Sequence, residues 1–245
     1  MSDPFFRPLA AGASAGYDVG LRAYMQRIFG YMASGLALTG AVAFLVAHTP
    51  LMGLFFTVLP TGQVHTTILG IIAMIAPLGF IIYMQMRMQR MSLVQIQTLF
   101  WVFSGLMGLS LSSIFLHFSQ ADIARAFFIT AADFAAMSLY GYTTRRDLTG
   151  MGAFMMMGLL GLIIASVINL LLQSSGLQWV VSVMSVIIFT GLTAYQVQGL
   201  KQIYDENQGG ETNTKLAVWG ALSLYLSFLN LFQAILSLTG GNRNN

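Results

Sequence analysis

Eight acidic side chains are the groups in this 245-residue chain that could hold a cation or a proton, and one of them stands apart. Asp133 lies well inside the apolar stretch AFFITAADFAAMSLYGY, whereas the other seven lie outside the long apolar stretches. If this stretch crosses a membrane, a central aspartate costs about 2.5–3.5 kcal/mol on insertion scales, so it should face the protein interior or water. Two roles stay open for Asp133: a ligand for an ion or proton, and a carboxyl group hydrogen-bonded to a neighbouring helix.

Two later stretches carry small or polar residues at helical spacing. These residues are Ser182, Ser185, Thr193 and Gln196 in one stretch, and Ser223, Ser227, Asn230, Ala234 and Ser237 in the other. Unpaired hydroxyl and amide groups are costly in an apolar environment, so we expect both stripes to point inward, where they can face each other. They would form either a hydrogen-bonded helix seam, which is the commoner arrangement, or the lining of a solvated path.

Other kinds of chemistry find little support in the sequence. Cysteine is absent, and His48, His65 and His117 lack the spacing of a metalloprotease motif. Neither a G-x-S-x-G motif nor a phosphate-binding P-loop occurs. We therefore predict neither a cofactor nor a resident metal ion, and we predict that the protein is not an enzyme.

The composition indicates the elements that must hold these side chains. Hydrophobic residues make up 56% of the chain and charged residues only 8%, against about 25% charged in average soluble proteins. A helix needs roughly 20 apolar residues to cross the hydrocarbon core, and seven stretches meet that requirement: 28–47, 66–85, 98–118, 123–142, 151–172, 178–199 and 217–239. The sequence thus predicts an all-α integral membrane protein, a bundle of seven transmembrane helices.

We expect one membrane domain over residues 25–240, preceded by a disordered cytosolic segment 1–24 and followed by a polar tail 241–245. With the N-terminus in the cytoplasm, nine basic residues fall inside: Arg7, Arg22, Arg27, Arg87, Arg90, Arg145, Arg146, Lys201 and Lys215. Only Arg125 and Arg243 fall outside. This bias favours a cytoplasmic N-terminus. Whether the last apolar stretch crosses the membrane or turns back within it stays open.

Four ordered motifs resemble those of a known family. The stretches FWVFSGLMGLSLSSIF, MSLYGYTTRRDLTGMGAF, IFTGLTAYQVQGLKQIY and GALSLYLSFLNLF are similar to the bacterial form of the Bax inhibitor-1 family. The resemblance implies a seven-helix protein of the bacterial inner membrane that acts as a pH-sensitive calcium leak. It also implies two aspartates, on the sixth and seventh helices, that share a proton, and basic residues near the second helix that pair with them. Arg87 and Arg90 occupy that basic neighbourhood.

The chain departs from the family pattern at both aspartates. The sixth helix reads Ala194-Tyr195-Gln196 where the family has Ala-Tyr-Asp, and Ser227 stands at the aspartate position of the seventh helix. An amide and a hydroxyl can hydrogen-bond each other, but they cannot share a proton, and they bind a divalent cation less well than carboxylates do. An alternative is that Asp133, on the fourth helix, replaces the charge of the two missing aspartates.

The family resemblance, together with the absence of the two aspartates, leads to two alternative functions. The first is a calcium or cation leak with altered or lost pH gating, in which Asp133, Thr193, Gln196, Ser227 and Asn230 line the ion pathway or the helix seam. The second is a regulator that does not transport ions and instead binds a membrane-anchored ATP-dependent protease.

Overall fold

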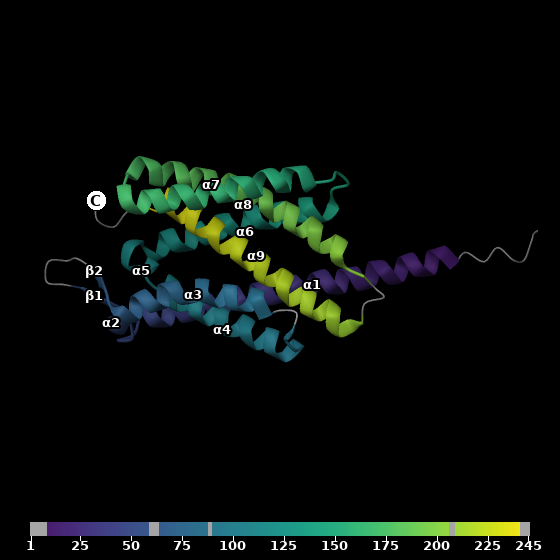
Figure 1. Ribbon diagram of the computed structural model, residues 1–245, viewed down its shortest axis with the longest axis horizontal. Coiled ribbons are helices and arrows are strands. Elements are labelled where there is room, and N and C mark those ends of the chain that lie inside the picture. Colours follow the sequence, from purple (N-terminus) through teal and green to yellow (C-terminus); the bar gives the residue numbers. More distant parts are fainter. Residues whose placement is uncertain (1–8, 59–63, 88–89, 206–208, 241–245) are drawn as a thin grey trace, which may run out of the picture.

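The computed structural model describes residues 9–58, 64–87, 90–205 and 209–240, with side chains from Val19 onward. The chain forms helices almost throughout (Figure 1). The elements are α1 (Leu9–Ala47), α2 (Met52–Phe55), β1 (Phe56–Val58), β2 (Val64–Thr66), α3 (Ile68–Arg87), α4 (Leu93–Leu111), α5 (Ile114–His117), α6 (Gln120–Thr143), α7 (Thr149–Leu172), α8 (Ser175–Ile203) and α9 (Gly210–Thr239). Strands β1 and β2 pair antiparallel within the 48–65 connection.

The prediction of seven membrane-spanning helices is confirmed. Seven helical segments of the described chain are long and apolar enough to cross a membrane, and each corresponds to one expected span. The third span is interrupted between α4 and α5. At the interruption the hydroxyl groups of Ser112 and Ser113 donate hydrogen bonds to the carbonyl groups of Leu109 and Ser110. Such local bonds compete with the regular helical pattern.

The N-terminal part of the chain differs from the expectation. Helix α1 begins at Leu9 and runs without a break to Ala47, so residues 9–24 are helical where the sequence leads us to expect disorder. No proline occurs between Pro8 and Pro50, so no residue of that type interrupts the helix. Residues 1–8 and the expected polar tail 241–245 lie outside the described residues.

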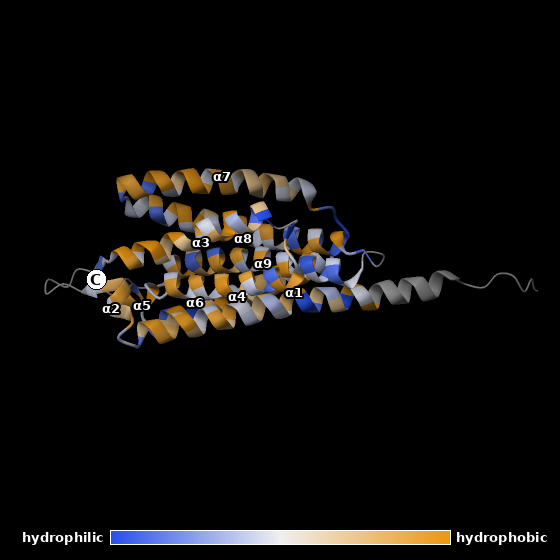
Figure 2. Ribbon diagram, turned by 60° about the horizontal axis from the view of Figure 1, so that its bottom comes forward, coloured by the Kyte–Doolittle hydropathy of each residue, from blue (hydrophilic) through white to orange (hydrophobic). Residues whose placement is uncertain are grey.

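Helix α9 is the centre of the bundle. It packs against α1, α4, α6 and α8, and in Figure 1 it runs diagonally between them. In the apolar segment of α9 that could span a membrane, 67% of the residues are buried, against 6% in the corresponding segment of α7. Figure 2 shows α7 at the edge of the bundle, with most of its ribbon in the colours of hydrophobic residues. Helix α9 is also continuous over 30 residues, or about 45 Å, which exceeds the roughly 30 Å of the hydrocarbon core.

Candidate functional site

The seam between α8 and α9 brings the two polar stripes together. The Ser227 hydroxyl donates a hydrogen bond to Gln196 Oε1 at 2.9 Å. Closer to the other end of the helices, the Ser182 hydroxyl donates to the Ser237 hydroxyl oxygen at 3.1 Å. Ser227 is buried and Gln196 is half-buried. The two polar stripes therefore face each other at two levels along the helices, as expected.

Two of the predicted site residues take no part in those cross-helix bonds. The Thr193 hydroxyl is buried and donates to the carbonyl of Phe189 on its own helix. Asn230 is exposed, and its amide donates to the carbonyl of Leu226. The expectation that Asn230 points inward is therefore wrong. Its side chain is turned by about 60° from that of Ser227 around α9, which is enough to leave the seam.

Asp133 faces a neighbouring helix, as the sequence predicts. The Thr190 hydroxyl on α8 donates a hydrogen bond to Asp133 Oδ2 at 2.8 Å, and both residues are half-buried. Thr190 precedes Gln196 by six residues, so the two contacts are separated by about 9 Å along α8. Within the described ranges, no three His, Asp or Glu residues come together as a potential metal site.

The basic residues expected near the site lie elsewhere. Arg87 ends α3 and Arg90 follows it, and both are exposed. They line a surface cavity of about 550 Å³ together with Gln85 and Met86. Helix α3 packs mainly on α4, and α4 in turn packs on α9. The structure does not bring Arg87 and Arg90 together with Gln196 and Ser227.

Two glycines fix the position of the Ala194-Tyr195-Gln196 motif. A Cβ atom at Gly141 on α6 would overlap the carbonyl group of Ala194. A Cβ atom at Gly152 on α7 would overlap the ring of Tyr195. Because only glycine permits these approaches, α6 and α7 clamp α8 from two sides next to Gln196.

Gln198 is a buried residue that the sequence prediction missed. Its Oε1 accepts a hydrogen bond from the Leu148 amide at 2.9 Å, and its Nε2 donates to the Arg146 carbonyl at 2.7 Å. The side chain thereby holds the loop between α6 and α7. The spacing in the sequence could have indicated a separate role for Gln198. It lies two residues after Gln196, so its side chain points to nearly the opposite side of α8.

Tyr225 is a second residue that the prediction missed. It is fully buried, and its hydroxyl lies 2.7 Å from the Thr39 hydroxyl on α1. Thr39 in turn donates to the Ser104 carbonyl on α4 at 2.8 Å. The Tyr225 ring contacts the rings of Phe100 and Phe103 edge-on. This contact ties the residue two positions before Ser227 to two other helices.

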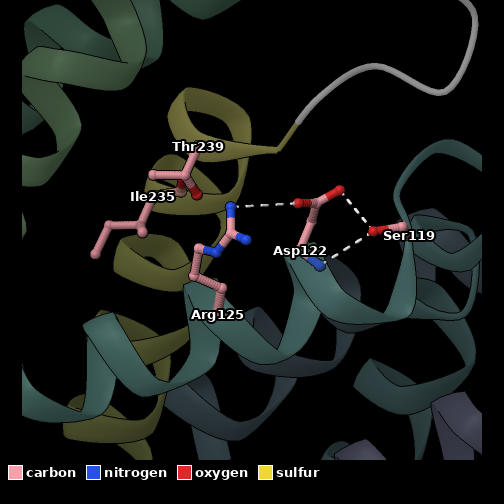
Figure 3. A network of polar contacts seen from close by, with 5 residues as sticks. All are labelled: Ser119, Asp122, Arg125, Ile235 and Thr239. Atoms are coloured by element: carbon pink, nitrogen blue, oxygen red, sulfur yellow. Dashed lines mark hydrogen bonds and ion pairs between the residues drawn. The ribbon is translucent and has the colours of Figure 1, made fainter.

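A small charged network lies at the N-terminal end of α6, near the C-terminal end of α9 (Figure 3). The Ser119 side chain caps α6 by accepting from the Asp122 amide, and its hydroxyl donates to Asp122 Oδ2 at 2.6 Å. Arg125 Nη1 lies 3.8 Å from Asp122 Oδ1, and its guanidinium points toward the last turn of α9. A cation is favourable at a helix C-terminus. This network caps the first turn of α6 and lies apart from the Gln196–Ser227 pair.

These helices and their polar seam define an integral membrane protein of the seven-helix bundle class. The family model described as "Inhibitor of apoptosis-promoting Bax1" matches residues 21–244. The chain therefore belongs to the Bax inhibitor-1 family.

Bacterial relatives match over nearly the whole chain. A protein of Rickettsia prowazekii (strain Madrid E) is 44% identical, covering 93% of each chain. The inner membrane protein YbhL of Escherichia coli (strain K12) is 42% identical, covering 91% of this chain and 94% of the relative. A protein of Caulobacter vibrioides is 39% identical, covering 94% of this chain and 93% of the relative.

Proposed function

We propose that this protein is a cation leak of the bacterial inner membrane, with calcium as its principal ion and with a closed state that does not respond to pH. The observation that carries the proposal is the Ser227–Gln196 hydrogen bond at 2.9 Å. It joins the two positions at which the family resemblance implies a pair of proton-sharing aspartates. The neutral contact keeps α8 and α9 together without an ionisable group.

The chemistry of the pair accounts for the loss of pH gating. Two adjacent carboxyl groups titrate as a unit, because both cannot stay ionised at low cost. A serine hydroxyl and a glutamine amide do not titrate between pH 5 and 8. Opening of the seam at this level then breaks a neutral hydrogen bond, and the equilibrium of this contact does not change with proton concentration.

Asp133 is the carboxylate that we assign to the moving cation. Its Oδ2 accepts one hydrogen bond, from Thr190, which leaves acceptor capacity for an ion. Hard cations such as Ca²⁺ prefer oxygen ligands, and carboxylates bind them most strongly. A single carboxylate binds a cation weakly, and weak binding allows the cation to leave the site and cross the membrane.

The orientation that we propose places the N-terminus in the cytoplasm. The N-terminal side of α1, the end of α3, the α6–α7 loop and the α8–α9 connection gather at one end of the bundle (Figure 1). Those segments carry the described basic residues that the sequence assigns to the inside. A cytoplasmic location for this end follows the positive-inside rule.

Liposomes containing purified protein and a trapped calcium dye test the leak. We expect calcium entry above that of empty liposomes, constant between pH 5 and 8, and reduced at least fivefold in Asp133→Asn. The matched control is Asp122→Asn at the outer end of α6. Entry equal to that of empty liposomes would refute the leak, and equal reductions in both variants would refute the role of Asp133.

A second candidate function rests on the shape of α1. This helix begins at Leu9, ten residues before its candidate membrane span, and it extends past the rest of the bundle in Figure 1. A projecting helix offers a contact surface for the membrane-anchored ATP-dependent protease of the regulator hypothesis. Deleting residues 2–18 would then change the turnover of protease substrates and abolish co-purification. Unchanged turnover without co-purification would exclude this candidate.

A further inference from the structure

A long apolar groove runs between α1 and α6 on the outside of the bundle. It consists of two adjoining cavities of about 890 and 340 Å³ that share Leu36, Gly40, Phe127 and Phe228. Phe228 of α9 contributes to both cavities, between the two helices. The larger cavity lies within the roughly 300–1,000 Å³ typical of small-molecule sites.

The groove is long enough for an acyl chain. Its α1 side extends from Arg22 to Ala41, nineteen residues apart, or about 28 Å. One leaflet of the hydrocarbon core is roughly 15 Å thick, half of the 30 Å total. An empty apolar groove of this size would forfeit the dispersion contacts of its walls. In a bilayer, a hydrocarbon chain is the group at hand to restore them.

Arg22, the charged residue among those that line the two cavities, lies at the end of the groove where α1 enters the bundle, whereas the uncharged Gln120 lines the other end. Arg22 and Gln26 are exposed there, and Arg22 forms no ion pair with any side chain that the structure describes. Tyr142 lines the facing wall, and Lys201 of α8 donates to its carbonyl at 3.1 Å and lies 5.3 Å over its ring. Arg22 therefore lines this opening, and the ammonium group of Lys201 lies behind the Tyr142 ring.

Below the opening, one buried polar atom has no partner. Ser138 is 7% exposed and lines the larger cavity, yet its hydroxyl makes no hydrogen bond in the described structure. Ser138 lies one helical turn from Tyr142 toward the apolar part of the groove. A buried hydroxyl without a partner costs free energy, so an acceptor supplied by a ligand would stabilise it.

We propose that the α1–α6 groove binds an anionic phospholipid from the surrounding leaflet. The phosphate binds Arg22, an ester carbonyl accepts from Ser138, and one acyl chain follows the groove toward Gly40. The order of these groups along the groove is that of a phospholipid: charge, ester, hydrocarbon. The proposal is independent of the proposed ion leak.

Gly40 permits a direct test, because a Cβ atom at this position would meet no other atom within 4 Å. The variant Gly40→Leu fills the groove without a steric clash at the backbone. Gly161→Leu on α7 is the matched control, since Gly161 is equally unobstructed and does not line the groove. Arg22→Gln removes the charge at the opening, and Arg145→Gln removes an exposed charge outside the groove.

Native mass spectrometry of the purified full chain, titrated with phosphatidylglycerol or phosphatidylcholine, measures the bound lipid. We expect one phosphatidylglycerol per chain, a loss of at least fivefold in Gly40→Leu, and none in Gly161→Leu. Arg22→Gln should reduce phosphatidylglycerol binding to the level of phosphatidylcholine, whereas Arg145→Gln should leave it unchanged. If Gly40→Leu does not fold by circular dichroism, Ala135→Leu on the α6 wall takes its place.

Three results would overturn the proposal. The first is equal lipid retention by the groove-filling variant and Gly161→Leu. The second is equal binding of the two lipids by the parent protein, or equal behaviour of Arg22→Gln and Arg145→Gln. The third is a protein dimer that is lost in Gly40→Leu, which would assign the groove to a second copy of the chain.

Discussion

Ser227 on α9 donates a hydrogen bond to Gln196 on α8 at 2.9 Å, and this contact joins the two positions at which the family resemblance leads us to expect aspartates. Interhelical hydrogen bonds in membranes contribute about 0.6 kcal/mol on average. We therefore predict that a double-mutant cycle of Gln196→Ala and Ser227→Ala gives a coupling energy of about 0.5–1.5 kcal/mol. Reversible unfolding in mixed detergent measures it. Strictly additive losses in the two single variants would show that the bond does not stabilise the seam.

Gln198 should contribute more to stability than Gln196. Substitution by leucine leaves the Leu148 amide and the Arg146 carbonyl without their partner. Each buried group left unpaired costs about 1–3 kcal/mol, so Gln198→Leu should lower the free energy of unfolding by about 2 kcal/mol or more. The control is Gln202→Leu, an exposed position on the same helix. Equal stability of the two variants would contradict the anchoring of the α6–α7 loop by Gln198.

The close approach of α7 to α8 predicts a large difference between two glycines. At Gly152 a side chain would overlap the Tyr195 ring, whereas at Gly150 nothing lies within 4 Å of an added Cβ atom. Overpacking of this kind costs about 1–3 kcal/mol. We expect Gly152→Leu to lower the thermal unfolding midpoint and Gly150→Leu to leave it within error. A shift of similar size in both variants would mean that helix propensity, not the contact with Tyr195, determines the effect.

Asp147 in the α6–α7 loop gives a pH dependence outside the membrane. Hydrogen bonds from the Thr149 hydroxyl and amide lower the pKa of Asp147 in the folded protein. A lowered folded pKa stabilises the protein above the unfolded value of about 3.9, and this stabilisation is lost as the pH falls through the folded pKa. Asp147→Asn should therefore lower the thermal midpoint at pH 7, and the difference from the parent should shrink below pH 4. A difference that grows on acidification would contradict this assignment.

The spans and the facing stripes could be predicted because both depend on local spacing. Apolar runs of about 20 residues mark helices wherever they occur, and the stripe of Ser182 and Gln196 marks the buried face of one helix. The direction of Asn230 could not be predicted, because a rotation of about 60° around α9 depends on how its neighbours pack. The partners of Gln198 and Tyr225 lie 50 and 186 residues away in the sequence. Only the assembled bundle brings such groups together.

Calcium flux into liposomes, compared between the parent and the double variant Gln196→Asp with Ser227→Asp, tests the central claim most directly. The claim is that the neutral Ser227–Gln196 pair holds a leak closed independently of pH. The account predicts a parent flux that is constant from pH 5 to 8 and a double-variant flux that changes severalfold over the same range, because two adjacent carboxyl groups titrate as a pair. Identical pH profiles for the two proteins would contradict the account, since the α8–α9 seam would then not control the passage of ions.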